Sequence, residues 1–114
     1  RDTAVLTWEK AIAATVVHYI NDVDADLEKI STDDFSYSTL AKHWSEMKGF
    51  ALGLQFNKNT PLNDADFITV HTMMGDMPVL TGGAEVSAYR ANLLIARDLL
   101  QAAYAFDAEN AANW

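Results

Sequence analysis

The sequence of 114 residues contains no cysteine. Disulfide scaffolds, zinc sites built from thiolates and cysteine nucleophiles are therefore excluded. Basic residues are also scarce, because 8 lysines and arginines stand against 16 aspartates and glutamates, which gives a formal net charge of −8. An acidic surface repels phosphate backbones and anionic lipid, so we expect no nucleic-acid partner and no docking on an acidic membrane.

Long hydrophobic runs are missing as well. No apolar stretch comes near the roughly 18 residues needed to cross a bilayer, so we predict no transmembrane segment in this chain. The composition is that of a folded protein, with 50% hydrophobic and 21% charged residues. The length suits a single helical domain at 1–114. Because the first residue is Arg1 rather than methionine, we expect a processed form or a part of a longer protein.

Apolar residues at steps of three and four predict a long helix over 3–30, which Thr3 can cap. Asn and Asp at 21–26 favour turns, so we expect this helix to kink or end there. After a polar connection at 31–36, a second helix is predicted over 38–56. The two apolar faces consist of Val5, Trp8, Ile12, Val16, Ile20, Val23, Leu27 and Ile30, and of Leu40, His43, Trp44, Met47, Phe50, Ala51 and Leu54.

Two more helices follow. Asn63 caps a third, shorter helix that Gly75 ends. After a joint at 81–83, a fourth helix is predicted over 84–106, and Trp114 in the polar tail is expected to dock against the body. No strand pattern competes with these helices. The predicted fold is therefore all-α, a bundle of about four helices that forms half of a larger bundle.

Small and aromatic residues give two further expectations about packing. Gly49 and Gly53 lie four residues apart inside the second predicted helix, where glycine is costly. We therefore expect another helix to approach closely at this pair. The aromatic side chains stand at helical spacing and are expected in the core rather than in a ligand site; they are Trp8, Trp44, Phe50, Phe56, Tyr89 and Tyr104.

The most specific chemical pattern is His43-Trp44-Ser45-Glu46. Residues three apart share a helix face, so the imidazole of His43 and the carboxylate of Glu46 can both reach one metal ion. The pattern also arises often by chance. In the alternative interpretation, His43 is a core histidine bonded to a carbonyl, and Glu46 pairs with Lys42 on the surface.

His18 and His71 extend the candidate metal set. His18 lies beside the apolar face of the first helix, one turn before Asp22, and His71 lies on the apolar face of the third helix. Together with His43 they place three histidines on three helices, and their convergence in a bundle core would give a site for a first-row metal. The alternative is that each histidine is satisfied independently.

Other catalytic or ion-binding patterns are weak. The alternating Asp22, Asp24 and Asp26 resemble the start of a calcium loop, but Leu27 stands where that loop requires Gly. A solvated acidic helix end accounts for them better. No Gly-x-Ser-x-Gly and no phosphate-binding glycine loop occurs. The glutamates that could pair as catalytic carboxylates are Glu9, Glu46 and Glu85, and nothing local distinguishes them.

Four segments carry a resemblance to a known family. They are 42–57 (KHWSEMKGFALGLQFN), the first helix from Trp8 to Asn21, 74–80 (MGDMPVL) and the closing segment 96–114. Together they resemble a bacterial lipoprotein family of unknown function that is related to the imelysin-like proteins. The resemblance covers most of the chain.

The resemblance implies an exported all-α protein, periplasmic or associated with the outer membrane or cell surface, of which this chain is the C-terminal half. It implies that an N-terminal half, or a second polypeptide, packs on the apolar faces. The wider imelysin group carries a Gly-x-His-x-x-Glu motif that is associated with metal binding and iron uptake. The matching positions here are Ala41, His43 and Glu46, so the glycine is replaced.

Three functions follow as hypotheses. The first is an extracytoplasmic protein that binds a divalent or ferric ion, or an iron-bearing ligand, through His43 and Glu46. The second is a surface interaction or assembly module without a cofactor, which would make the isolated chain a homo-oligomer. The third is a metallopeptidase, although a His-Glu pair supplies two ligands where catalysis usually needs three. Whether the chain is an enzyme stays open.

Overall fold

The computed structural model describes residues 2–55, 57, 59–79 and 83–114. Within these ranges the chain is all-α, as predicted, with five α-helices, one 3-10 turn and no strand. The helices are α1 (Asp2–Glu28), α2 (Tyr37–Leu52), α3 (Asp64–Met74), α4 (Ala84–Tyr104) and α5 (Ala108–Asn113), and the 3-10 turn η1 (Gly53–Gln55) follows α2 directly. Thr3 of the predicted cap has its side chain outside the described part, as do residues 81 and 82 of the predicted joint.

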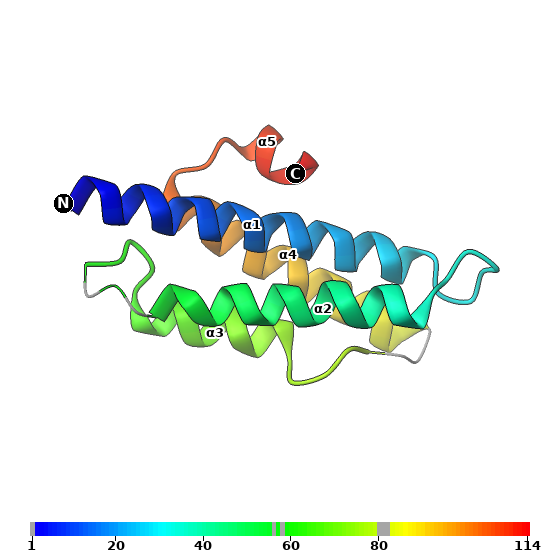
Figure 1. The fold of residues 1–114 in the computed structure, drawn as a ribbon. Coiled ribbons are helices and arrows are strands. Elements are labelled where there is room, and N and C mark those ends of the chain that lie inside the picture. The colour runs from blue at the N-terminus through cyan, green and yellow to red at the C-terminus, as the bar shows by residue number, and fades with distance from the viewer. Residues whose placement is uncertain (1, 56, 58, 80–82) are drawn as a thin grey trace.

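Helices α1 to α4 form an elongated bundle in which successive helices run in opposite directions (Figure 1). Its principal extents are 49 × 24 × 23 Å. Helix α1 packs on both α2 and α4, and the short helix α5 lies on the outer side of α1. Among the described helices, none combines the length and apolarity that spanning a membrane requires.

Side-chain caps fix the helix starts. Ser36 accepts a hydrogen bond from the backbone N–H of Thr39 at 3.2 Å and starts α2. Asn63 accepts from the N–H of Asp66 at 2.8 Å, which confirms the predicted cap of α3. Gly75 ends α3 with a φ of +76°, a conformation that glycine adopts without steric cost.

One prediction about the chain path is wrong, and one helix was not predicted. Helix α1 runs through 21–26 without a break, because Val23 and Leu27 are fully buried there and the aspartates find partners on neighbouring helices. The polar tail also forms a helix, α5, which Asp107 caps through its side chain. In both places tertiary contacts outweigh the weak helix propensity of Asn and Asp.

The core is the set of apolar faces that the helices turn toward one another. It contains Ala13, Val16, Val17, Ile20, Val23, Leu27, Leu40, Met47, Ala51, Leu54, Leu62, Val70, Met74, Val86, Tyr89, Leu93, Ala96, Leu100, Tyr104 and Ala111. Half of the apolar face predicted for the first helix lies in this set, Ile12 and Ile30 pack against it while partly buried, and Val5 and Trp8 are exposed. The predicted core residues that are exposed show how the helices are rotated about their axes.

Trp8 and Phe50 were predicted in the core and are not buried. Trp8 is 62% exposed, because the buried face at the start of α1 is that of Glu9 and Ala13, one residue further round the helix. Phe50 is 42% exposed and stacks on the ring of Tyr19, with centroids 5.8 Å apart. The prediction therefore located the helices correctly but misjudged their rotation at these two positions.

The prediction that another helix approaches closely at Gly49 and Gly53 is also wrong. A Cβ atom added at either residue meets nothing within 4 Å. The buried face of α2 carries Met47 and Ala51, and Gly49 lies two residues from each, on the other side of the helix.

Tyr89 joins three helices in the core. Its hydroxyl donates to the carbonyl oxygen of Met74 at 2.6 Å and accepts from the indole N–H of Trp44 at 2.9 Å. Burial raises the pKa of Tyr89 to about 12, against an ordinary value of 10.0. The neutral phenol is therefore the form that the fold stabilises.

Glu9 is a buried carboxylate, with only 2% of its surface exposed. The hydroxyls of Tyr104 and Thr60 both donate to its Oε2 atom at 2.5 Å. Thr60 in turn accepts from the backbone N–H of Leu62 at 3.1 Å. This network fastens the loop before α3 to α1 and α4, and the sequence did not single out Glu9 from the other glutamates.

Asn21 holds α5 against the bundle. Its amide donates to the carbonyl oxygens of Ala111 and Trp114, each at 2.9 Å, while its own oxygen accepts from Arg97 at 2.8 Å. The indole of Trp114 meets Phe106 edge-on, with ring centroids 5.0 Å apart. Trp114 is therefore docked, as predicted.

Replacement of Tyr104 by Phe tests the Glu9 network. The substitution removes one donor from a buried carboxylate and keeps the ring, so we expect the free energy of unfolding to fall by about 1–3 kcal/mol. Urea denaturation measures this change. Tyr37, which is 55% exposed, provides the matched control, and Tyr37→Phe should leave the stability unchanged. Equal stability of the two variants would contradict a contribution from the network.

Alkaline denaturation tests the environment of Tyr89. Its pKa is raised on folding, so the stability it contributes is complete below pH 10 and is lost as pH rises toward about 12. The unfolding free energy should drop by about 1–2 kcal/mol between pH 9 and pH 11 from this residue alone. Tyr89→Phe should show a smaller drop than Tyr37→Phe, and the same drop in both variants would contradict the assignment.

Candidate functional site

His43 lies on α2 and faces α1. Its Nδ1 atom is 2.6 Å from Oδ2 of Asp26, and its Nε2 atom is 3.7 Å from Oδ2 of Asp22. The His43 side chain is 23% exposed. An ionised carboxylate only accepts hydrogen bonds, so the short contact to Asp26 places the proton of a neutral His43 on Nδ1. The Nε2 atom then presents its lone pair toward Asp22.

His18 approaches the same carboxylate from within α1. Its Nε2 atom is 3.2 Å from Oδ2 of Asp22, one helical turn further along, and its side chain is 50% exposed. One oxygen of Asp22 therefore lies within reach of two imidazole Nε2 atoms. We call His18, Asp22, His43 and Asp26 the α1–α2 histidine cluster.

The spacing of the aspartates explains how the cluster forms. Asp22 and Asp26 lie four residues apart on one face of α1 and turn toward α2, whereas Asp24 points to the opposite side. There Asp24 accepts from Nε of Arg90 on α4 at 2.7 Å. This contact raises the pKa of Arg90. The three aspartates thus join neighbouring helices, and neither a calcium loop nor a solvated helix end describes them.

Glu46, the predicted partner of His43, has a different contact. It receives a hydrogen bond from the phenol of Tyr19, and this bond is the main cause of the raised pKa of Tyr19. Tyr19 also lies beside His43, with ring centroids 6.2 Å apart. Glu46 therefore borders the histidine cluster through Tyr19, while Asp22 and Asp26 contact His43 directly.

His71 does not join the other two histidines. It lies on α3, and its Nδ1 atom is 3.1 Å from Nζ of Lys48. Burial and the nearby charge of Lys48 lower the pKa of His71. Of the three histidines considered for convergence, two share a carboxylate and the third forms a separate pair.

In this arrangement, no three histidine or carboxylate side chains of the described residues stand close enough to enclose a metal ion. The contacts of His43 are nevertheless those of a potential ligand. Histidines that bind metals usually donate their other ring N–H to a carboxylate, which fixes the ring and makes it more basic. Asp26 occupies that position relative to His43.

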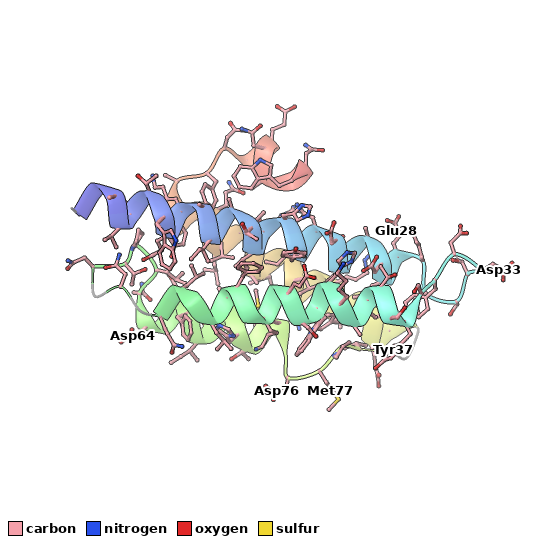
Figure 2. All side chains as sticks on the ribbon, viewed as in Figure 1. Glu28, Asp33, Tyr37, Asp64, Asp76 and Met77 are labelled. Atoms are coloured by element: carbon pink, nitrogen blue, oxygen red, sulfur yellow. The ribbon has the colours of Figure 1, made fainter. Side chains whose placement is uncertain are left out.

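Sequence reasoning proposed His18, His43 and His71 but missed the role of Asp26. A signal was present, because His18, Asp22 and Asp26 recur every four residues along one face of α1. Only the packing of α2 on that face shows which histidine they meet. Figure 2 shows this side of the bundle, with Glu28 and Tyr37 marking the end at which α1 and α2 are connected.

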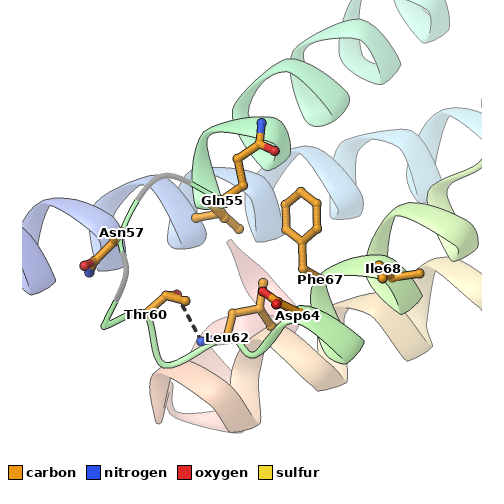
Figure 3. Close-up of a pocket in the computed structure, with 8 residues that line it drawn as sticks. Gln55, Asn57, Thr60, Leu62, Asp64, Phe67 and Ile68 are labelled. Atoms are coloured by element: carbon orange, nitrogen blue, oxygen red, sulfur yellow. Dashed lines mark hydrogen bonds between the residues drawn. The ribbon is translucent and has the colours of Figure 1, made fainter.

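A second candidate lies at the other end of the bundle, where a pocket of about 430 Å³ opens beside α3 (Figure 3). Its walls come from η1, the loop before α3 and α3 itself, and consist of Leu54, Gln55, Asn57, Thr60, Leu62, Asp64, Phe67 and Ile68. Asp64 is the titratable group in this wall, and the Thr60 hydroxyl donates to Glu9. The pocket thus offers shape and apolar surface rather than a set of reacting groups.

Comparison with protein-family models, with curated proteins and with solved structures finds no significant match for this chain. The comparisons therefore show no family for this chain.

Proposed function

We propose that this protein binds a first-row divalent metal ion at the α1–α2 histidine cluster. His18 Nε2, His43 Nε2 and the carboxylate of Asp22 would be the ligands. The observation that carries the proposal is the position of Asp22 Oδ2, 3.2 Å from one imidazole nitrogen and 3.7 Å from the other. Asp26 supports it by holding His43 through Nδ1.

Binding requires a modest rearrangement. Metal–nitrogen bonds are about 2.0–2.1 Å long, so both imidazoles would move closer to a common centre. His18 has room to do this, because half of its side chain is exposed. The ion would take the place of direct imidazole–carboxylate contacts, and the net charge of −8 would favour its approach.

The ligand chemistry narrows the choice of ion. Two imidazoles and one carboxylate suit ferrous iron, zinc, cobalt or nickel. Calcium and magnesium prefer oxygen ligands throughout. An iron ion or an iron-bearing ligand agrees with the function that the resemblance to imelysin-like proteins implies. We extend the proposal accordingly to an exported protein at the periplasmic or cell-surface side, with the N-terminal half of the same precursor as its partner.

A set of single variants tests the site. Titration with Co²⁺, followed by visible absorption, and with Zn²⁺, followed by calorimetry, should give one ion per chain. We expect His43→Ala and Asp22→Asn to weaken binding at least tenfold, because each removes a ligand. Asp26→Asn should weaken it by about 10–100-fold through loss of the orienting contact.

Two controls separate this site from the alternatives. Glu46→Gln and His71→Gln should leave affinity unchanged, because neither residue contacts His43 in the way that Asp22 and Asp26 do. If Glu46→Gln abolishes binding while Asp22→Asn does not, the His43–Glu46 pair predicted from sequence is the site instead. Unchanged affinity in both His43→Ala and Asp22→Asn would refute a metal centre at α1 and α2.

A cofactor-free assembly module is the second candidate function, and exposed apolar side chains favour it. Trp8 is 62% exposed, Ile68 63% and Met77 71%. Single exposed hydrophobic residues are common, but large ones of this kind also mark interaction surfaces.

Sedimentation tests the assembly hypothesis. If Trp8 contributes to self-association, the wild-type chain should be oligomeric at micromolar concentration and Trp8→Ser should shift it toward the monomer. Thr15→Ser, a change that keeps the surface polarity of α1, is the control. A monomeric wild-type chain would contradict self-association.

A further inference from the structure

A second pocket, of about 360 Å³, lies between α2 and α3, apart from the histidine cluster. Lys48 of α2 and His71 of α3 form its polar wall, and Phe67 and Ile68 form its apolar wall. Thr72, Gly75 and Asp76 complete the lining. Figure 2 shows the loop that carries Asp76 on the side of α2 away from α1.

The polar wall pairs an amine with a base. Nζ of Lys48 donates to Nδ1 of His71 at 3.1 Å. The partner of the amino group in this contact is an imidazole and not a carboxylate. The His71 ring is fixed in turn by Phe67, with ring centroids 4.5 Å apart. An amine and a proton acceptor thus lie in contact at the edge of a cavity.

The surroundings lower the pKa of both groups, which shifts each of them toward its neutral form. Burial lowers the pKa of Lys48, and the carboxylate of Asp76 opposes this effect without cancelling it. Burial and the Lys48 charge likewise lower the pKa of His71, against the influence of the Ala51 carbonyl. His71 Nε2 is buried and makes no hydrogen bond of good geometry with the described residues.

We propose that Lys48 is a nucleophilic amine that condenses with a small, uncharged aldehyde bound in this pocket, with His71 as its proton-transfer partner. A lysine becomes reactive when its surroundings are desolvated and a base stands beside it. This inference is independent of the metal site.

The reaction balances without an oxidant or a reductant. His71 Nδ1 accepts a proton from the Lys48 ammonium, and the freed nitrogen lone pair forms a C–N bond to the carbonyl carbon. The π electrons of the C=O bond pass to oxygen, which takes a proton from His71 and gives a carbinolamine. The carbinolamine nitrogen still carries two N–H protons and a positive charge. Loss of the hydroxyl with one of these protons yields water and leaves the protonated Lys48 imine.

The lining indicates the class of aldehyde. Phe67 and Ile68 provide apolar surface for a short aliphatic or aromatic substituent. Asp76 and the net charge of −8 repel a carboxylate or phosphate on the ligand. The preference for Lys48 over the exposed Lys42 should therefore be larger with an uncharged aldehyde such as butanal than with glyoxylate, which carries a carboxylate.

Reductive trapping of the full chain tests the proposal. The protein is treated with limiting butanal and sodium cyanoborohydride at pH 7.5, and peptide mass spectrometry compares Lys48 with Lys42. Lys42 is the matched control, because it is exposed on the same helix. Labelling of Lys48 should be severalfold faster than labelling of Lys42, because burial lowers the pKa of Lys48 and His71 contacts its amino group. Equal rates at the two lysines would overturn the proposal.

Two variants test the roles of the neighbours. His71→Phe keeps a ring against Phe67 and removes the base, so labelling of Lys48 should fall to the rate of Lys42. Asp76→Asn removes the charge that favours the ammonium form, so labelling should rise. Asp76 lies in an exposed loop, so this variant remains informative even if His71→Phe fails to fold.

Two outcomes of these experiments would contradict the proposal, and one would support the role of His71. If Asp76→Asn slows labelling, the electrostatic account of the pocket is wrong. If glyoxylate prefers Lys48 over Lys42 as strongly as butanal does, the pocket does not select uncharged aldehydes. Loss of selectivity for Lys48 over Lys42 in His71→Phe, with unchanged circular dichroism, would support the assigned role of His71.

Discussion

Burial of helix α1 is the constraint on which the rest of this structure depends. Its central residues Ala13, Val16, Val17, Ile20 and Val23 are fully inaccessible to solvent. A helix that is apolar over so wide a stripe must be covered by more than one neighbour. Here α2 and α4 both pack on α1, and α5 closes over its outer side.

Because α1 has neighbours on several sides, its polar residues become connectors. Asp22 and Asp26 contact His43 of α2, Asp24 contacts Arg90 of α4, and Asn21 holds α5. Polar groups placed between packed helices need partners, since unpaired ones would lose their hydration without compensation. The α1–α2 histidine cluster thus forms because α2 packs on the face of α1 that carries Asp22 and Asp26.

Helix α2 separates two chemically different regions. His43 and Lys48 are five residues apart, which turns them about 140° from each other around the helix axis. His43 therefore contacts the carboxylates of α1, and Lys48 contacts His71 of α3. A histidine that contacts carboxylates is placed to bind a cation. A lysine that contacts a neutral imidazole is placed to react with an electrophile. The two proposals need not involve a common ligand.

The sequence by itself determined the helices and most of the buried faces, because these depend on local spacing, caps and glycine. The cap at Asn63 and the stop at Gly75 are local in this sense. The rotation that exposes Trp8, the pairing of Asp26 with His43 and the burial of Glu9 between Thr60 and Tyr104 were decided by the tertiary structure. The contacts of Asp26 and of Glu9 join residues 17 to 95 positions apart. These contacts and the exposure of Trp8 depend on how whole helices pack rather than on any local preference.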